Sequence, residues 1–220
     1  MQRIPEPELM EDEAQARAYA RADFEEPHSH FLRLFREHFP DWRARGTVLD
    51  LGCGPADITL RFARGFPACH LLGVDGARAM LEYGRQAVAA AGLESRVTLV
   101  QARLPAEEVP GRAYAAVISN SLLHHLADPG VLWEAIRCHA AAGSPVFVMD
   151  LRRPESKAAA RRLQQQYAAG EPAILQRDFY HSLLAAYTPV EIEAQLAAAQ
   201  LPFRVRVVSD RHLVISGIMP

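Results

Sequence analysis

Short apolar runs alternate with amphipathic stretches from residue 46 to the end of the chain, a pattern typical of an α/β sheet wrapped by helices. The runs predict seven strands, near residues 47–51, 70–75, 96–101, 115–119, 144–150, 204–210 and 212–218. The first run, with Val48, Leu49 and Leu51, is nearly continuous, as expected for a parallel strand covered on both faces. The last two runs are separated by so short a polar turn that they predict an antiparallel hairpin at the sheet edge.

Capping signals predict where several helices begin and end. Asp128 and Pro129 supply an N-cap and a first-turn proline for one helix, which Gly143 is expected to terminate. Thr188 and Glu191 form a capping box around a proline at the first helical position. The alternation of strands and capped helices therefore predicts a doubly wound α/β fold.

A glycine-rich turn follows the first predicted strand, where the chain reads Gly52-Cys53-Gly54 before a helix that begins near Ala56. Glycines at such positions let the backbone turn sharply and pass close to a ligand. The fingerprint of dinucleotide-binding folds requires a third glycine three residues after the second, and this chain has Asp57 there. An acidic residue in the first helical turn also makes the site unfavourable for a pyrophosphate. The turn therefore disfavours a dinucleotide.

The segment VLDLGCGPAD, followed by LLGVDGARAML, resembles the first two motifs of the class I methyltransferases. The resemblance extends from about Gly46 to the C-terminus. It implies a doubly wound sheet of seven mostly parallel strands whose last strand is antiparallel. It also implies S-adenosylmethionine (SAM) as the methyl donor and S-adenosylhomocysteine (SAH) as the product, while it carries almost no information about the acceptor.

We expect one domain, residues 1–220, in four parts. Residues 1–45 are predicted to form an N-terminal helical cap, in which an amphipathic stretch at 8–40 lies across the carboxyl edge of the sheet. Residues 46–150 form the SAM-binding core and residues 188–220 a helix and the hairpin. Between them, 151–187 is a long excursion, and long excursions in compact domains are often lids or binding elements.

The resemblance assigns the cofactor to residues at the ends of the first four strands. Asp75 follows Gly54 by 21 residues, where a carboxylate can accept hydrogen bonds from both ribose hydroxyls, although a role as a helix cap is the alternative. Asp50 is expected to hydrogen-bond the turn or, through water, the methionine ammonium. Leu104 is expected to pack on adenine. The predicted cofactor-binding residues are Asp50, Gly52, Cys53, Gly54, Asp75, Gly76, Arg103, Leu104, Asn120 and Ser121.

The stretch from Ser119 to Pro129 leaves the fourth strand at the edge where α/β sheets bind ligands. It resembles the variant of the family's fourth motif that carries paired histidines, found in many small-molecule methyltransferases. His124 or His125 is a candidate general base, since histidine titrates near neutral pH. A structural role, packing under the adenosine or bonding to backbone, is the alternative. Adjacent residues on a helical turn point about 100° apart, so we expect at most one to face the methyl group and no metal site.

Substrate candidates come from the two regions outside the minimal sheet. Tyr19, Phe24 and His28 belong to the N-terminal region, and Asp150, Arg152 and Tyr180 to the end of the fifth strand and the excursion. Aspartate and tyrosine suit a polar substrate, and Arg152 or its neighbour Arg153 suits a carboxylate. Each of these side chains has a structural alternative, as a core aromatic or a solvated charge.

The composition of the chain indicates which kinds of partner and compartment to expect. Lys and Arg number 24 against 26 Asp and Glu, so there is no general attraction to nucleic acid, and we expect a small-molecule substrate. The 3 cysteines are widely spaced, and the N-terminus is acidic and has no signal-peptide pattern, which favours a cytoplasmic protein. No apolar run suits a membrane span. We expect a monomer or a homodimer.

The functional hypothesis is a SAM-dependent methyltransferase that acts on a small molecule by in-line displacement. One alternative from another class is a non-catalytic, SAM-binding regulatory module, which the intact pairing of Gly52, Gly54 and Asp75 argues against. A second alternative, an NAD-dependent oxidoreductase, is opposed by Asp57.

Overall fold

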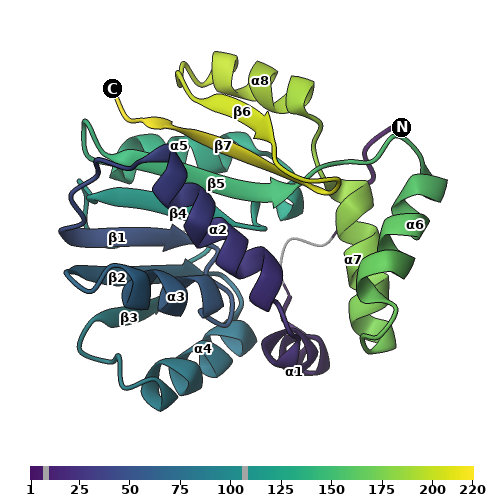
Figure 1. Ribbon diagram of the computed structural model, residues 1–220, viewed down its shortest axis with the longest axis horizontal. Helices are drawn as coiled ribbons and strands as arrows, with labels where there is room; N and C mark the ends of the chain where they lie inside the picture. Colours follow the sequence, from purple (N-terminus) through teal and green to yellow (C-terminus); the bar gives the residue numbers. More distant parts are fainter. Residues whose placement is uncertain (7–9, 106–108) are drawn as a thin grey trace.

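A seven-stranded sheet lies between two layers of helices in the computed structural model, which describes residues 1–6, 10–105 and 109–220 (Figure 1). The strand order is β3-β2-β1-β4-β5-β7-β6, and β7 runs antiparallel to both of its neighbours. This confirms the predicted class I methyltransferase fold. The strands are β1 (Gly46–Leu51), β2 (Cys69–Asp75), β3 (Val97–Gln101), β4 (Ala116–Asn120), β5 (Pro145–Leu151), β6 (Arg204–Val207) and β7 (His212–Ile218).

Successive residues of each strand supply the two halves of the core. On β5, Phe147 packs under α2 and α3, while Val146 and Val148 pack under α5 and α8. A third group, α1, α6 and α7, lies beyond the carboxyl ends of the parallel strands (Figure 1). The helices are α1 (Glu13–Arg21), α2 (Glu25–His38), α3 (Asp57–Gly65), α4 (Arg78–Ala90), α5 (Gly130–His139), α6 (Lys157–Ala168), α7 (Ala173–Ala185) and α8 (Pro189–Ala198), with a 3-10 helix η1 (Leu123–His125).

The N-terminal region divides its two helices between two positions. Only α1 lies at the carboxyl edge, where the whole stretch 8–40 was expected; positions 8 and 9 lie outside the described residues. The helix α2 instead covers a face of the sheet. Its Phe31 meets Phe147 of β5 edge to face, with ring centroids 4.9 Å apart, and its Phe35 meets Phe62 of α3 at 4.9 Å. Burial of these rings holds α2 on the sheet, because large aromatic surfaces dominate core packing.

Several predicted boundaries shift for local reasons. Helix α5 begins at Gly130 rather than directly after Asp128, because the Asp128 carboxylate accepts the Gly130 amide at 2.8 Å in a turn of its own. The helix also ends at His139, ahead of Gly143. The strand predicted at 204–210 stops at Val207. The capping box at the start of α8 is present as predicted.

The helices of the described ranges are too short or too polar to cross a bilayer.

Candidate functional site

A cavity of about 1090 Å³ opens at the carboxyl ends of β1, β2 and β4, beneath α1 and α7. Its floor comes from the sheet and its outer wall from the N-terminal region and the excursion. All ten residues predicted to bind the cofactor line this one cavity: Asp50, Gly52, Cys53, Gly54, Asp75, Gly76, Arg103, Leu104, Asn120 and Ser121. The fold therefore brings these residues, which are spread between positions 50 and 121 of the sequence, around one cavity.

The glycine turn is built tightly against its neighbours. The amides of Gly52 and Cys53 both donate to the carbonyl of Val74, at 2.8 and 3.0 Å. Both glycines have positive φ, +72° at Gly52 and +51° at Gly54. A Cβ on Gly52 would lie 2.8 Å from the Cβ of Leu122, whereas a Cβ on Gly54 would meet no atom within 4 Å. Gly52 thus permits the close approach of the histidine-bearing loop, and Gly54 leaves the cavity open.

Asp75 ends β2 and folds back onto the turn. Its Oδ2 accepts the amide of Gly54 and its Oδ1 the amide of Ala77, both at 2.8 Å. The second bond lies in the turn before α4; the N-cap of that helix is Ala77 and it has no side-chain cap, so the alternative role of Asp75 as a helix cap is wrong. Burial raises the pKa of Asp75, although the two amides oppose the shift. Each oxygen has a further lone pair, so the side chain retains capacity for ribose hydroxyls.

Asp50 hydrogen-bonds a helix residue rather than the glycine turn. Its Oδ2 accepts the hydroxyl of Thr59 in α3 at 2.6 Å, and both side chains are buried. Burial raises the pKa of Asp50 to about 7. The bond joins the first strand to the helix that follows the turn, so it fixes the turn from behind.

Asp57, the residue that breaks the dinucleotide fingerprint, is occupied by protein partners. It pairs with His28 of α2 and with Arg61, whose Nε lies 2.8 Å from Oδ2. Burial opposes ionisation, but these two hydrogen bonds prevail and lower the pKa of Asp57. The carboxylate therefore stays charged at the cavity wall and fastens α2 to α3.

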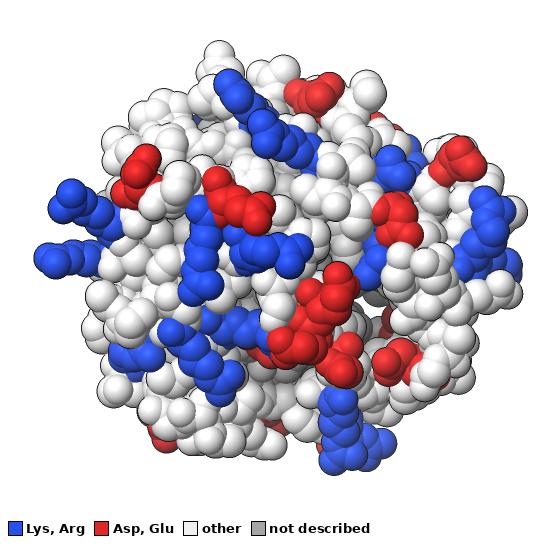
Figure 2. Space-filling model, in the orientation of Figure 1, with Lys and Arg blue, Asp and Glu red and all other residues white. Residues whose placement is uncertain are grey.

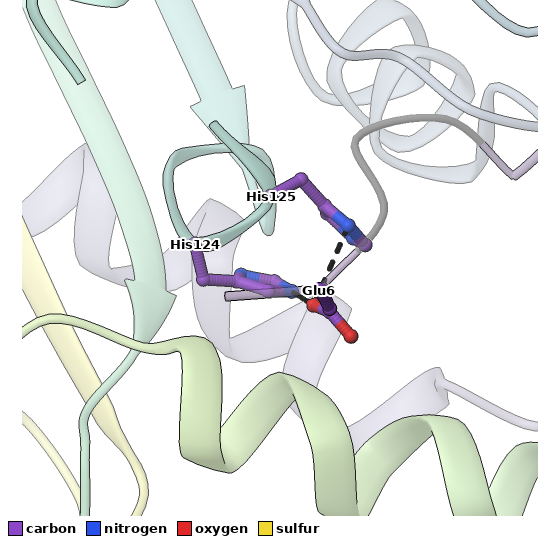
Figure 3. Close-up of side chains that lie close together, drawn as sticks. All are labelled: Glu6, His124 and His125. Carbon is purple, nitrogen blue, oxygen red and sulfur yellow. Dashed lines mark ion pairs between the residues drawn. The ribbon is translucent and has the colours of Figure 1, made fainter. Parts of the chain in front are cut away.

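The paired histidines converge on a third side chain, Glu6 (Figure 3). Their rings lie side by side, with centroids 4.2 Å apart and planes inclined by 34°. Glu6 Oε1 lies 3.5 Å from His124 Nε2 and 3.4 Å from His125 Nδ1. The expectation that the two side chains would diverge is wrong, because His124 presents its distal nitrogen and His125 its proximal one.

Long-range contacts hold this cluster in place. Asp150 Oδ1 lies 2.6 Å from His124 Nδ1, and Asp150 Oδ2 accepts the amide of Leu123 at 2.8 Å. Burial alone would lower the pKa of His124, but Asp150 raises it. Burial also raises the pKa of Glu6. The Arg3 guanidinium donates to the carbonyl of His124 at 2.9 Å, which ties the N-terminal segment to the loop.

The substrate candidates from the N-terminal region all face the cavity. Tyr19, Phe24 and His28 form a row, with ring centroids 4.7 Å apart for the first pair and 5.0 Å for the second. Burial raises the pKa of Tyr19 to about 12, so its hydroxyl remains a hydrogen-bond donor. This row forms an aromatic wall of the cavity.

The structure does not bring the candidates from the fifth strand and the excursion together with the others, because Asp150, Arg152 and Tyr180 do not line the cavity. Asp150 is buried behind His124, which it orients. Arg152 donates to the carbonyl of Asp210 at 3.3 Å, and Arg153 pairs with Glu191 at 2.6 Å. Tyr180 faces α6, where the Arg161 guanidinium lies 4.6 Å from the ring centroid. In each case the side chain contacts a partner that is distant in sequence.

The cavity is predominantly acidic. Its described lining includes ten Asp or Glu side chains and four Arg side chains. Exposed carboxylates come from Glu11, Asp12, Asp23 and Glu26, and Figure 2 shows acidic side chains gathered around a hollow in this face. A negative rim of this kind repels polyanions.

Solved methyltransferases share this fold. A SAM-dependent methyltransferase from Aquifex aeolicus superposes with a TM-score of 0.69, at 15% identity over 95% of this chain and 99% of its own. The plantazolicin methyltransferase BpumL, solved with a pentazolic desmethylPZN analog and SAH, gives a TM-score of 0.70 at 12% identity, over 94% of this chain and 90% of its own.

Curated relatives match over part of their length. The 23S rRNA (uracil(1939)-C(5))-methyltransferase RlmD of Klebsiella pneumoniae is 35% identical over 67% of this chain and 29% of its own. The trans-aconitate 2-methyltransferase of Azoarcus sp. is 29% identical over 46% of this chain and 38% of its own. This chain therefore spans well under half of these relatives.

Residues 48–143, from the first strand through the histidine loop to the end of α5, match the methyltransferase domain family. The chain contains a class I methyltransferase domain. SAM is the cofactor of this class.

Sequence reasoning missed several polar residues of this methyltransferase domain's cavity. Glu6 reaches the histidines from the N-terminal segment, and Ser182 of α7 donates to Glu6 Oε2 at 3.3 Å. Gln15 of α1 donates to Asp178 of α7 at 2.7 Å and so joins the two helices over the cavity. No local motif marks these residues, because each acts through a partner more than a hundred positions away. The acidic residues of the N-terminal segment are evident in the sequence, but the sequence does not indicate which of them contacts the histidines.

Proposed function

We propose that this protein transfers a methyl group from SAM to a small-molecule acceptor. The observation that carries the proposal is the single cavity, in which the predicted cofactor residues adjoin a polar cluster of Glu6, His124 and His125. A methyl donor and an acceptor need to meet in one space shielded from bulk water.

The donor would lie along the carboxyl ends of β1 and β2. Asp75 would accept the ribose hydroxyls, and Gly52 and Gly54 would let the methionine part approach the backbone. Leu104, which lines the same cavity, would pack against the adenine. Asn120 and Ser121 would then border the sulfonium, four and three residues before His124. This arrangement directs the methyl group toward the polar cluster.

The shape and charge of the cavity favour a small acceptor over RNA. The helices α1 and α7 are joined over it by Gln15 and Asp178, which restricts access for a folded polymer. The exposed carboxylates at its rim repel phosphates, whereas nucleic-acid binding depends on Lys and Arg. The relatives named above include both an rRNA enzyme and a small-molecule enzyme, and these features of the chain align it with the second.

The reaction itself asks little of the protein beyond alignment. The acceptor lone pair attacks the methyl carbon while the carbon–sulfur bond breaks and its electron pair goes to sulfur, which yields SAH. Holding the nucleophile in line with the methyl group and sulfur removes much of the entropic barrier. The aromatic wall of Tyr19, Phe24 and His28 would position the acceptor for this attack.

Two measurements test the proposal. Calorimetric titration with SAM, SAH and NAD should give binding of the first two and none of the third. Radiolabelled SAM, incubated with the protein and with separate metabolite and RNA fractions, should label the metabolite fraction. Absence of SAM binding would overturn the whole proposal, and label confined to RNA would overturn the choice of acceptor.

A further inference from the structure

Glu6, His124 and His125, which line the cavity, bring one carboxylate and two imidazoles together (Figure 3). We propose that these three side chains bind a divalent transition-metal ion of the zinc type. Two histidines and one glutamate form the ligand set of many catalytic zinc sites, and imidazole favours such ions over Mg²⁺ or Ca²⁺.

The distances from Glu6 to the two imidazoles fit an ion better than a hydrogen bond, and all three ligand atoms lie within 4.8 Å of one another. Zinc bonds of about 2.0–2.1 Å at tetrahedral angles place neighbouring ligand atoms about 3.4 Å apart. Glu6 Oε1 lies 3.5 Å from His124 Nε2 and 3.4 Å from His125 Nδ1. Both separations exceed the 2.7–3.2 Å typical of a nitrogen–oxygen hydrogen bond.

A carboxylate oxygen, Glu6 Oε1, lies at the centre of the cluster. The Glu6 side chain is only 9% exposed, and its Oε1 has no hydrogen-bond partner among the described residues. Leaving such an acceptor buried and unsatisfied is costly, more so when it carries charge. A cation bound between Glu6 and the two rings would satisfy it.

Both buried ligands are also held from behind, as in known metal sites. His124 uses Nδ1 to bond Asp150 at 2.6 Å, which turns Nε2 toward Glu6. Glu6 accepts the Ser182 hydroxyl on its other oxygen at 3.3 Å. Partners of this kind orient metal ligands and tune their basicity, and losing one typically lowers metal affinity by about 10- to 100-fold.

Three protein ligands leave a tetrahedral ion with one position free, and the cluster lies on the cavity wall. Resting on the proposed function, this position would take the oxygen of a hydroxyl-bearing acceptor. Coordination lowers the pKa of such a hydroxyl. Its proton would leave to solvent, the oxygen pair would attack the methyl carbon, and the electron pair of the broken carbon–sulfur bond would pass to sulfur.

The test measures metal binding without any methyl transfer. Untagged protein, stripped with chelator, is titrated calorimetrically with Zn²⁺ and with Mg²⁺. We expect one zinc ion per chain and no Mg²⁺ binding. Glu6→Gln and His125→Asn should each weaken zinc affinity by about 100-fold or more. Loss of a direct ligand should cost at least as much as the largest effect typical of a residue that only orients a ligand. His181→Asn, which removes an exposed imidazole from the same cavity, should leave the affinity unchanged.

Asp150→Asn should lower zinc affinity by about 10- to 100-fold. If that buried variant does not fold, Glu6→Gln still decides, since Glu6 lies in the N-terminal segment. Equal zinc affinity in wild type and Glu6→Gln, or an equal loss in His181→Asn, would overturn the metal site. SAM titration of the zinc-free protein separates the two proposals, because failure to bind SAM overturns the methyl-transfer function and leaves the zinc stoichiometry standing.

Discussion

Replacing Gly52 with Ala should destabilise the fold more than the same replacement at Gly54. Both positions have positive φ, so either alanine carries a left-handed backbone cost of about 1–2 kcal/mol. At Gly52 the new Cβ would also lie 2.8 Å from the Cβ of Leu122 and 2.9 Å from its nearer methyl carbon. Overpacking of this kind costs about 1–3 kcal/mol more. We therefore expect losses of about 2–5 kcal/mol for Gly52→Ala and about 1–2 kcal/mol for Gly54→Ala.

Urea unfolding, followed by circular dichroism, measures both free energies of unfolding against wild type. Gly54→Ala is the matched control, since it shares the backbone cost and would meet no atom within 4 Å. The difference between the unfolding free energies of the two variants measures the cost of the steric clash between residue 52 and Leu122 of the histidine loop. Equal destabilisation would refute the reasoning, because it would mean that the loop moves away from Gly52 at no cost.

Two further changes test the cofactor site and the pH response. Asp75→Ala should weaken SAM binding about 10- to 100-fold in calorimetry, because charge-assisted hydrogen bonds to the ribose are lost. Asp128→Ala removes a carboxylate outside the cavity and should leave SAM affinity unchanged. Equal SAM affinity in Asp75→Ala and wild type would contradict the ribose role. Burial lowers the pKa of His212 to about 3, so the unfolded chain takes up a proton below pH 6.5 and stability falls. His212→Gln should abolish about 2 kcal/mol of the loss in unfolding free energy between pH 7 and 5, and an unchanged pH slope would refute this.

The parts of the fold that local patterns determine were predictable. Apolar runs located six strands to within one residue at each end, and in all of these except β3 most residues are buried, as near-continuous runs require. The capping box of Thr188 and Glu191 predicts the start of α8 correctly, because both partners lie within one turn of the chain. Val207 ended its strand early because the following residues turn to meet His212, whose carbonyl accepts the Val208 amide.

Side-chain roles at the site depended on which distant segments became neighbours. The sequence favours Asp150 as a substrate ligand because it lies at the end of the fifth predicted strand, at the ligand-binding edge. The adjacency of β4 and β5 instead brings it to His124, 26 residues earlier in the chain. Tyr180 looked equally available, but the packing of α6 on α7 places Arg161 over its ring. A sequence records the chemical capacity of such residues, while tertiary contacts decide which partner uses it.

The histidine pair shows how a sound rule of geometry led to a wrong conclusion. Side chains of adjacent helical residues leave the backbone in different directions, which is true of His124 and His125. An imidazole, however, has two nitrogens at different distances from the backbone. Asp150 binds the near nitrogen of His124 and frees the far one, whereas His125 offers its near nitrogen, so the two meet at Glu6. The convergence therefore depends on Asp150 and on Arg3, which holds the segment that carries Glu6, and neither dependence follows from the spacing of the histidines.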